Sequence, residues 1–265
     1  MAAGVYVCRA EPAAVNLGLI VGSEAALVVD TGSSPAQGRL VRDATSRVTA
    51  VPVQAAAATH WHYDHCFGMA GFADLETFAH ESVRERLMAP ETARIAADLG
   101  VEVHALALPA REIAVAAAVD LGGRRVELVH LGPGHTDGDI VVVVPAADIV
   151  FAGDLIESAG PPWYGNDSYP HDWPTTLDSV IGLMTEKTIA VPGHGDPVGR
   201  EFVFEQRGRV AAVSTEIRRL AESGVPESEA LDAGSWPFAV GHVADGIKPG
   251  YQQLVSEERK SLPLL

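Results

Sequence analysis

The hexapeptide His60-Trp61-His62-Tyr63-Asp64-His65 is the most informative part of this sequence, and it follows the apolar run from Val51 to Ala58. In an extended segment alternate side chains point the same way, so His60, His62 and Asp64 can converge on one cavity, and a turn can add His65. Histidines packed together as plain core would be costly, because each imidazole needs a hydrogen-bond partner and protonated rings repel one another. The hexapeptide therefore predicts a metal site in which one short peptide serves two ions.

Three further residues of the same chemical kind occur later in the chain, each next to glycine at the end of an expected strand. They are His135 in Gly132-Pro133-Gly134-His135-Thr136, Asp154 in Phe151-Ala152-Gly153-Asp154, and His194 in Pro192-Gly193-His194-Gly195. Strand ends are where loops build functional sites, and glycine lets backbone approach a ligand closely. These residues are therefore candidates to complete the metal site.

Apolar runs and turn residues predict two similar halves. For the first half we expect strands over 15–21, 25–30 and 51–58, a helix within 34–47, and a helix from 81 to 100 broken at Pro90. For the second half we expect strands over 113–119, 125–131, 140–144, 149–152 and 188–191, with helices around 177–184 and 210–220. Each half then forms a sheet covered by helices on one face, which predicts an α/β (α+β) fold arranged as a four-layer αββα sandwich.

The domain organisation follows from this order of elements. We expect one domain over residues 1–265, with an N-terminal half over about 1–110 and a C-terminal half over about 111–224. The tail over 225–265 holds Trp236, Phe238 and Tyr251 among turn residues, and it is either a docked arm or a homodimer contact.

Composition narrows the function classes. The formal net charge is −16, from 35 acidic and 19 basic side chains, so nucleic acid and anionic membrane surfaces are disfavoured as partners. The two cysteines, Cys8 and Cys66, are too few for a disulfide framework, and no stretch is long and apolar enough to span a membrane. We therefore expect a cytoplasmic protein that acts on a small molecule, not on nucleic acid or at a membrane.

The segments quoted above, together with Asp30-Thr31-Gly32, resemble in kind and order those of the metallo-β-lactamase superfamily. The resemblance covers the chain to about residue 200. It implies a dinuclear site whose two ions share Asp154. One ion would be bound by His60, His62 and His135, and the other by Asp64, His65 and His194. Asp30 would orient the ligand loop without touching metal. Zinc suits nitrogen and carboxylate ligands, although iron, manganese or cobalt could occupy the same set.

The resemblance also implies hydrolysis by a metal-bridging hydroxide, with Asp64 as a proton shuttle. Asp154 stands where true β-lactamases of this kind carry cysteine, and Glu157 where they commonly carry the lysine that binds the antibiotic carboxylate. Glu157 would repel that carboxylate, unless it points to solvent. We therefore expect cleavage of an ester, thioester or lactone bond. The alternatives are a β-lactam-hydrolysing metallo-β-lactamase and, from another class, an iron-dependent persulfide dioxygenase-like oxidoreductase.

Residues near the expected ligands are candidates for the substrate pocket. The loop that follows Asp154 offers Trp163, Tyr164 and Asn166, and His171 could edge the same pocket. Thr136, directly after His135, is a candidate for a supporting hydrogen bond.

Overall fold

The computed structural model describes residues 1–261, with side chains described through residue 256. The strands of the first half are β1 (Val5–Ala10), β2 (Val15–Val21), β3 (Ala26–Val29), β4 (Val53–Ala57), β5 (Glu76–His80) and β6 (Arg111–Ile113). Those of the second half are β7 (Ala116–Asp120), β8 (Arg125–His130), β9 (Ile140–Val144), β10 (Ile149–Glu157), β11 (Ile189–His194) and β12 (Val198–Gly199). The hydrogen-bonded order is β6-β5-β4-β3-β2-β11-β10-β9-β8-β7, with β1 paired to β2 and β12 to β11.

Helices lie outside these strands. The first half has α1 (Pro35–Thr45), α2 (Tyr63–Cys66), α3 (Glu81–Met88) and α4 (Pro90–Asp98). The second half has α5 (Trp173–Leu183) and α6 (Arg200–Glu222), followed by α7 (Glu227–Ala233), α8 (Val240–Val243) and α9 (Ile247–Ser261). Short 3-10 helices are η1 (Phe67–Phe72), η2 (Val103–Ala105), η3 (Pro145–Ala147) and η4 (Ala244–Gly246). Among the described residues, no helix is both long and apolar enough to cross a membrane.

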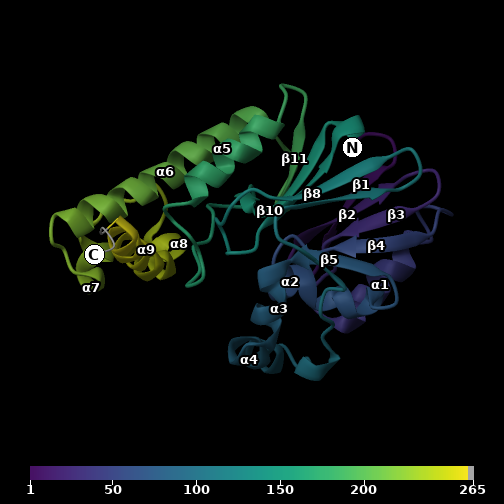
Figure 1. Ribbon diagram of the computed structural model, residues 1–265, viewed down its shortest axis with the longest axis horizontal. Helices are drawn as coiled ribbons and strands as arrows, with labels where there is room; N and C mark the ends of the chain where they lie inside the picture. Colours follow the sequence, from purple (N-terminus) through teal and green to yellow (C-terminus); the bar gives the residue numbers. More distant parts are fainter. Residues whose placement is uncertain (262–265) are drawn as a thin grey trace.

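One large hydrophobic cluster lies between the two halves of the sheet, and another lies under the helices of the second half. Leu27, Val29 and Phe78 of the first half pack against residues such as Leu128 and Phe151 of the second. The outer face of the first half is covered by α1 and η1, and that of the second half by α5 and α6, as Figure 1 shows. The layers therefore run helix, sheet, sheet, helix, which confirms the predicted αββα sandwich.

The strand predicted over residues 113–119 is wrong in one respect. It is two strands, because β6 pairs with β5 of the first half whereas β7 pairs with β8 of the second. The chain thus crosses between the halves at Ala114 and Val115, near the predicted boundary. Strands β1 and β5 were not predicted, and β10 continues five residues beyond the predicted end at Ala152, to Glu157.

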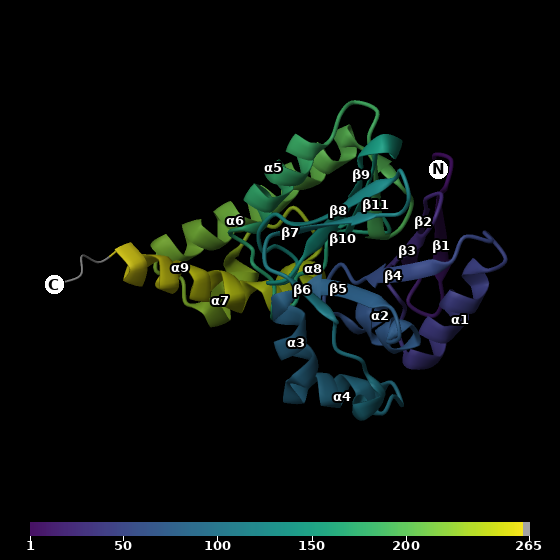
Figure 2. The same cartoon turned by 45° about the vertical axis from the view of Figure 1, so that its right-hand side comes forward.

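The tail after Gly224 is docked on its own chain over the described residues. Ala230, Val243 and Ile247 are buried in the same hydrophobic cluster as α5 and α6. In both views (Figures 1 and 2) α7 and α9 lie beside the distal part of α6. Of the two alternatives for the tail, the structure therefore supports the docked arm, and a homodimer contact stays a prediction.

Close packing of glycines fixes the segment that directly follows the ligand loop. A Cβ atom placed on Gly38 of α1 would lie 1.9 Å from the carbonyl oxygen of Gly68 in η1. Only glycine allows this approach, so α1 packs directly on the segment that follows His65. Thr31 strengthens the same junction, since its backbone N–H and its hydroxyl both donate to the carbonyl oxygen of His65.

Candidate metal centre

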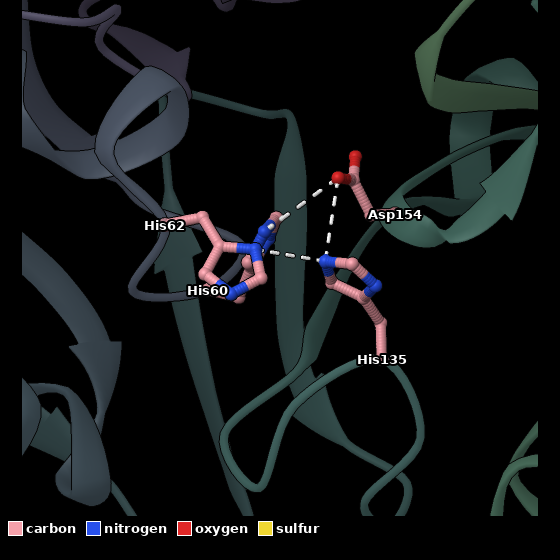
Figure 3. Close-up of side chains that lie close together, drawn as sticks. All are labelled: His60, His62, His135 and Asp154. Atoms are coloured by element: carbon pink, nitrogen blue, oxygen red, sulfur yellow. Dashed lines mark hydrogen bonds and ion pairs between the residues drawn. The ribbon is translucent and has the colours of Figure 1, made fainter. Parts of the chain in front are cut away.

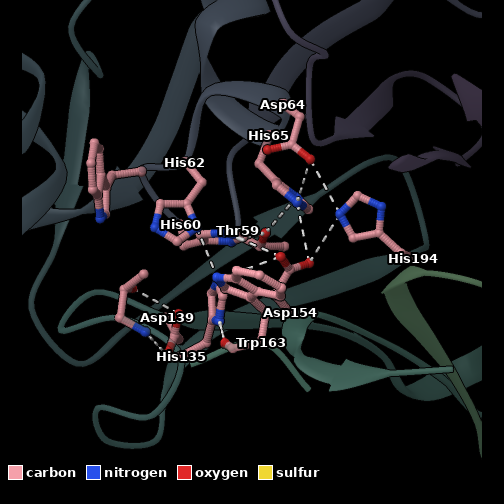
Figure 4. Close-up of polar contacts among 12 residues, drawn as sticks. Thr59, His60, His62, Asp64, His65, His135, Asp139, Asp154, Trp163 and His194 are labelled. Carbon is pink, nitrogen blue, oxygen red and sulfur yellow. Dashed lines mark hydrogen bonds and ion pairs between the residues drawn. The ribbon is translucent and has the colours of Figure 1, made fainter. Parts of the chain in front are cut away.

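The seven predicted ligands meet at one end of the sandwich, where several strands end (Figure 4). His60 and His62 lie in the loop after β4, and Asp64 and His65 lie in α2. The remaining three come from the loop after β8, from β10 and from the end of β11 in the second half; they are His135, Asp154 and His194. Because β10 and β11 are parallel, the carboxyl ends of both strands reach the same edge.

The first group consists of three histidines and one aspartate, all of whose ligand atoms lie within 4.8 Å of one another. Figure 3 shows His60, His62 and His135 directed toward Asp154. His135 Nε2 lies 2.9 Å from His62 Nδ1 and 3.4 Å from Asp154 Oδ2. His60 Nε2 lies 3.8 Å from the same carboxylate oxygen.

The second group consists of Asp64, His65 and His194, again within 4.8 Å of one another. Asp64 Oδ2 lies 3.2 Å from His194 Nε2 and 3.6 Å from His65 Nε2. Asp154 faces this group with its other oxygen, because Oδ1 lies 3.2 Å from His65 Nε2 and 3.6 Å from His194 Nε2. Asp154 therefore stands between the groups, one oxygen toward each.

The expectation that strand alternation would place Asp64 is wrong, although Asp64 does reach the same centre as His60 and His62. The backbone is extended only through His62, which is the N-cap of α2, and it is helical from Tyr63. The helical turn directs Asp64 and His65 to the second group instead. The resulting sets are those that the family resemblance implied.

Four of the ligand imidazoles, those of His60, His62, His65 and His135, are held from the outer side by a hydrogen bond. His65 Nδ1 lies 2.9 Å from Asp30 Oδ2, and Asp30 also accepts the backbone N–H of Thr59. His135 Nδ1 donates to the carbonyl oxygen of Trp163, at 3.2 Å. In a neutral imidazole, a nitrogen that donates outward leaves the opposite ring nitrogen with a lone pair, and at this site that lone pair would face the centre.

Three of the inner atoms have no hydrogen-bond partner. His60 Nε2, His65 Nε2 and Asp154 Oδ1 are buried and unpartnered. Burial lowers the pKa of His135 to about 4 and that of His60 well below its usual value, so both rings are neutral. Leaving several polar atoms buried without partners is costly, and neutral imidazoles beside carboxylates suit divalent cations such as zinc. The residues present therefore fit a metal centre.

Glycine beside a ligand has the predicted effect at Gly193. A Cβ atom there would lie 1.7 Å from Asp154 Oδ1, so any larger residue would displace that carboxylate. Gly153 has a positive φ of 53° and lies against the Thr59 hydroxyl. These two glycines let β10 and β11 bring Asp154 into the space between the histidines.

A family model described as the metallo-beta-lactamase superfamily matches residues 10–194, which is well over half of the chain. This chain belongs to the metallo-β-lactamase superfamily. The type 2 metallo-beta-lactamase of Bacteroides fragilis is 27% identical over 187 residues, covering 70% of this chain and 70% of that protein. Acyl-coenzyme A thioesterase MBLAC2 of Bos taurus is 28% identical over 216 residues, covering 71% of this chain and 76% of that protein. The structure of a metallo-beta-lactamase from Pontibacter korlensis shares the fold, with a TM-score of 0.63 at 20% identity over 80% of this chain and 96% of that one.

Two of the predicted pocket residues of this superfamily member lie near the centre, and the other two point into the second half of the fold. Trp163 is 52% exposed beside His135, and Asn166 lines a cavity next to the centre. The expectation for Tyr164 is wrong, because its side chain is fully buried and packs on Trp173 of α5. His171 is directed to the helices of the second half, where its Nδ1 lies 2.8 Å from Ser214 Oγ.

Two other predicted residues lie close to the ligands. Glu157 is half-buried and its carboxylate lies within 4.8 Å of the ligand atoms of Asp154 and His194. Burial, with the Asp154 charge, raises the pKa of Glu157 to about 7. Thr136 donates to both carboxylate oxygens of Asp139 and so fixes the turn after His135. No hydrogen bond joins Thr136 to a ligand ring in the described residues.

Asp167 was not predicted, although it holds His62. Its Oδ2 accepts from Trp61 Nε1 at 2.7 Å and lies 3.1 Å from His62 Nε2. Burial alone would raise the pKa of Asp167, but these hydrogen bonds keep it well below its usual value. The carboxylate thus stays charged and orients the ring whose Nδ1 faces the centre.

We expect Asp167→Ala to weaken zinc binding by the first group about 10- to 100-fold, the usual effect of removing the outer partner of a ligand histidine. Zinc competition titrations with a chromophoric chelator measure this. Asp167→Asn is the matched variant, since its amide oxygen can still accept from His62 and should restore most of the affinity. Equal zinc affinities in wild type and Asp167→Ala would contradict this role.

Proposed function

We propose that this protein is a dinuclear zinc hydrolase that cleaves an ester, thioester or lactone bond. The observation that carries the proposal is the position of Asp154, with one carboxylate oxygen toward each of two groups of ligands. His62 and His194 keep 22% and 18% of their side-chain surface exposed, so a substrate can reach the centre from solvent.

The residues of the site suit such a reaction. Two zinc ions, when bound, supply a water of lowered pKa and polarise a carbonyl group. Asp64 stands at the centre with Oδ2 3.2 Å from His194, and a carboxylate there can take a proton from the nucleophile and pass it to the leaving group. Asp30 and Asp167 hold His65 and His62 in place, so the ligands need not reorganise during turnover.

The position of Glu157 favours ester or thioester substrates and disfavours substrates that carry a carboxylate next to the scissile bond. It lies at the edge of the centre beside Asp154 and His194, and its ionised form, which predominates above its pKa of about 7, would repel that carboxylate. The likeness to an acyl-coenzyme A thioesterase agrees with this preference. The likeness to the Bacteroides fragilis enzyme keeps β-lactam hydrolysis as the second candidate. A persulfide dioxygenase needs only one metal, so the second ligand group lends it less support.

Metal analysis followed by a substrate screen tests the proposal. Purified protein is assayed by elemental analysis and then with nitrocefin, aryl esters, lactones and S-lactoylglutathione. We expect two zinc ions per chain and turnover of an ester, lactone or thioester that exceeds turnover of nitrocefin. Turnover of nitrocefin alone would favour the second candidate, and turnover of none of these with a single bound iron would overturn the proposal.

We expect Glu157→Lys to raise the preference for β-lactams. Replacing a repulsive charge by an attractive one contributes on the order of 1 kcal/mol or more in a partly dry site, which is about fivefold or more in kcat/KM. The measurement is the kcat/KM of nitrocefin divided by that of p-nitrophenyl acetate. Glu157→Gln, the matched control, removes only the repulsion and should give a smaller rise. The same ratio in wild type and both variants would show that Glu157 does not select the substrate.

A further inference from the structure

A cavity of about 450 Å³ lies beside the candidate metal centre. Its wall is formed by the loop around residues 166–172, by Arg86 of α3, and by α9 of the C-terminal tail. Asp167 belongs to this wall and also contacts His62, so one histidine ring separates the cavity from the centre. A substrate bound at the centre can therefore extend its remainder toward this space.

The charged side chains of the wall are already paired. Arg86 Nη2 donates to Asp137 Oδ2 at 2.7 Å, and Asp172 Oδ2 accepts from Gln253 Nε2 at 2.6 Å. Asp167 accepts the two hydrogen bonds described above. A charged ligand group would have to displace one of these hydrogen bonds, and an anionic group would also face the carboxylates of Asp167 and Asp172, so the wall favours an uncharged group.

The uncharged side chains of the wall retain their hydrogen-bonding capacity. Within the described part of the chain, the side-chain polar groups of Asn166, Tyr169 and Gln252 make no hydrogen bond, and all three residues are at least partly exposed. Ser168 Oγ also has no partner, but it is buried and a ligand in the cavity does not reach it. The accessible spare groups are two amides and a phenol, and they match a ligand with uncharged hydrogen-bonding groups.

We propose that this cavity binds the uncharged, amide- or hydroxyl-bearing part of the substrate, distant from the bond that is cleaved. The proposal rests on the hydrolase function proposed above. Gln252 comes from α9, beyond residue 194 where the family match ends. The tail is tied to the loop of the wall, because Tyr164 N–H donates to the carbonyl oxygen of His242 and His171 N–H donates to Gln253 Oε1. The C-terminal tail thus completes a recognition site that the matched region lacks.

Two thioesters that differ in this part test the proposal. S-acetylpantetheine carries two amides and hydroxyls without charge, and S-ethyl thioacetate carries none. The measured quantity is the preference, which is the kcat/KM of S-acetylpantetheine divided by that of S-ethyl thioacetate. It is measured in wild type, Gln252→Leu and Asn166→Ala. Gln54→Leu, at an exposed position of β4, is the matched control. Asn166 is exposed and its amide makes no hydrogen bond among the described residues, so Asn166→Ala should not impair folding.

We expect wild type to prefer S-acetylpantetheine. Gln252→Leu and Asn166→Ala should each lower this preference about fivefold, the effect of one lost hydrogen bond. Gln54→Leu should keep the wild-type preference. An unchanged preference in both cavity variants would overturn the proposal. If wild type cleaves neither thioester, the thioesterase function fails, and equilibrium binding of panthenol then tests the cavity alone. Saturable binding that Gln252→Leu weakens would support the cavity site, and absence of binding would refute it.

Discussion

Replacing Asp154 by alanine is expected to abolish the paired metal centre. Among the described residues, Asp154 is the ligand that faces both groups, with Oδ2 toward His60 and His135 and Oδ1 toward His65 and His194. Without this carboxylate, two cations would lie near each other with less negative charge between them. We expect bound zinc to fall from two ions to one or fewer. The kcat/KM should fall by more than about a hundredfold, since even outer partners of ligands account for 10- to 100-fold effects.

Elemental analysis and steady-state kinetics on the same preparation measure both effects together. Asp154→Cys is the informative companion variant, because a thiolate is also a zinc ligand and should retain more metal than alanine does. Asp196→Ala, an exposed aspartate shortly after His194, controls for loss of negative charge near the site. Full turnover with two zinc ions in Asp154→Ala would refute the shared-ligand arrangement.

Local patterns in the sequence were sufficient to predict most of the centre. The hexapeptide from His60 to His65 and the glycine-flanked His135, Asp154 and His194 are short segments whose chemistry is visible without knowledge of tertiary contacts. The error lies in Asp64, which was assigned by strand alternation although the chain becomes helical at Tyr63. Four residues are too few to show a helical period, so periodicity could not detect this turn.

The parts that the sequence could not predict depend on contacts between distant segments. Asp167 reaches His62 across 105 positions of the chain, and no motif marks this aspartate. Tyr164 is buried because the tail closes over it: a Cβ atom on Gly246 would lie 2.6 Å from Tyr164 Cβ. The break between β6 and β7 likewise depends on strand pairing, since each strand pairs in a different half. Such features follow from packing, which a single sequence does not display.

Removal of metal is expected to destabilise the whole protein. The ligands come from both halves of the sandwich, so bound ions would join the loop after β4 to β10 and β11. If free zinc is present at about 1,000 times its dissociation constant, binding stabilises the folded state by about 4 kcal/mol. For a chain of this size that corresponds to a Tm about 10 °C lower after treatment with a chelator. Differential scanning fluorimetry before chelation, after it, and after zinc is restored measures the change.

The Tm difference between zinc-loaded and chelated protein should depend on pH. This pH dependence distinguishes the loss of a specific ion from a general effect of the chelator. In the metal-free protein, burial opposes protonation of His194, but Asp64 and Asp154 outweigh it and raise the pKa to about 9 from 6.5. Because its pKa is raised on folding, protonated His194 stabilises the folded metal-free protein. This stabilisation is fully present below pH 6.5 and is lost as pH rises through about 9. Zinc requires the unprotonated imidazole, so its binding strengthens over the same range. The Tm difference between zinc-loaded and chelated protein should therefore widen from pH 6.5 to pH 9. A difference that stays constant or narrows over this range would show that zinc does not bind at His194.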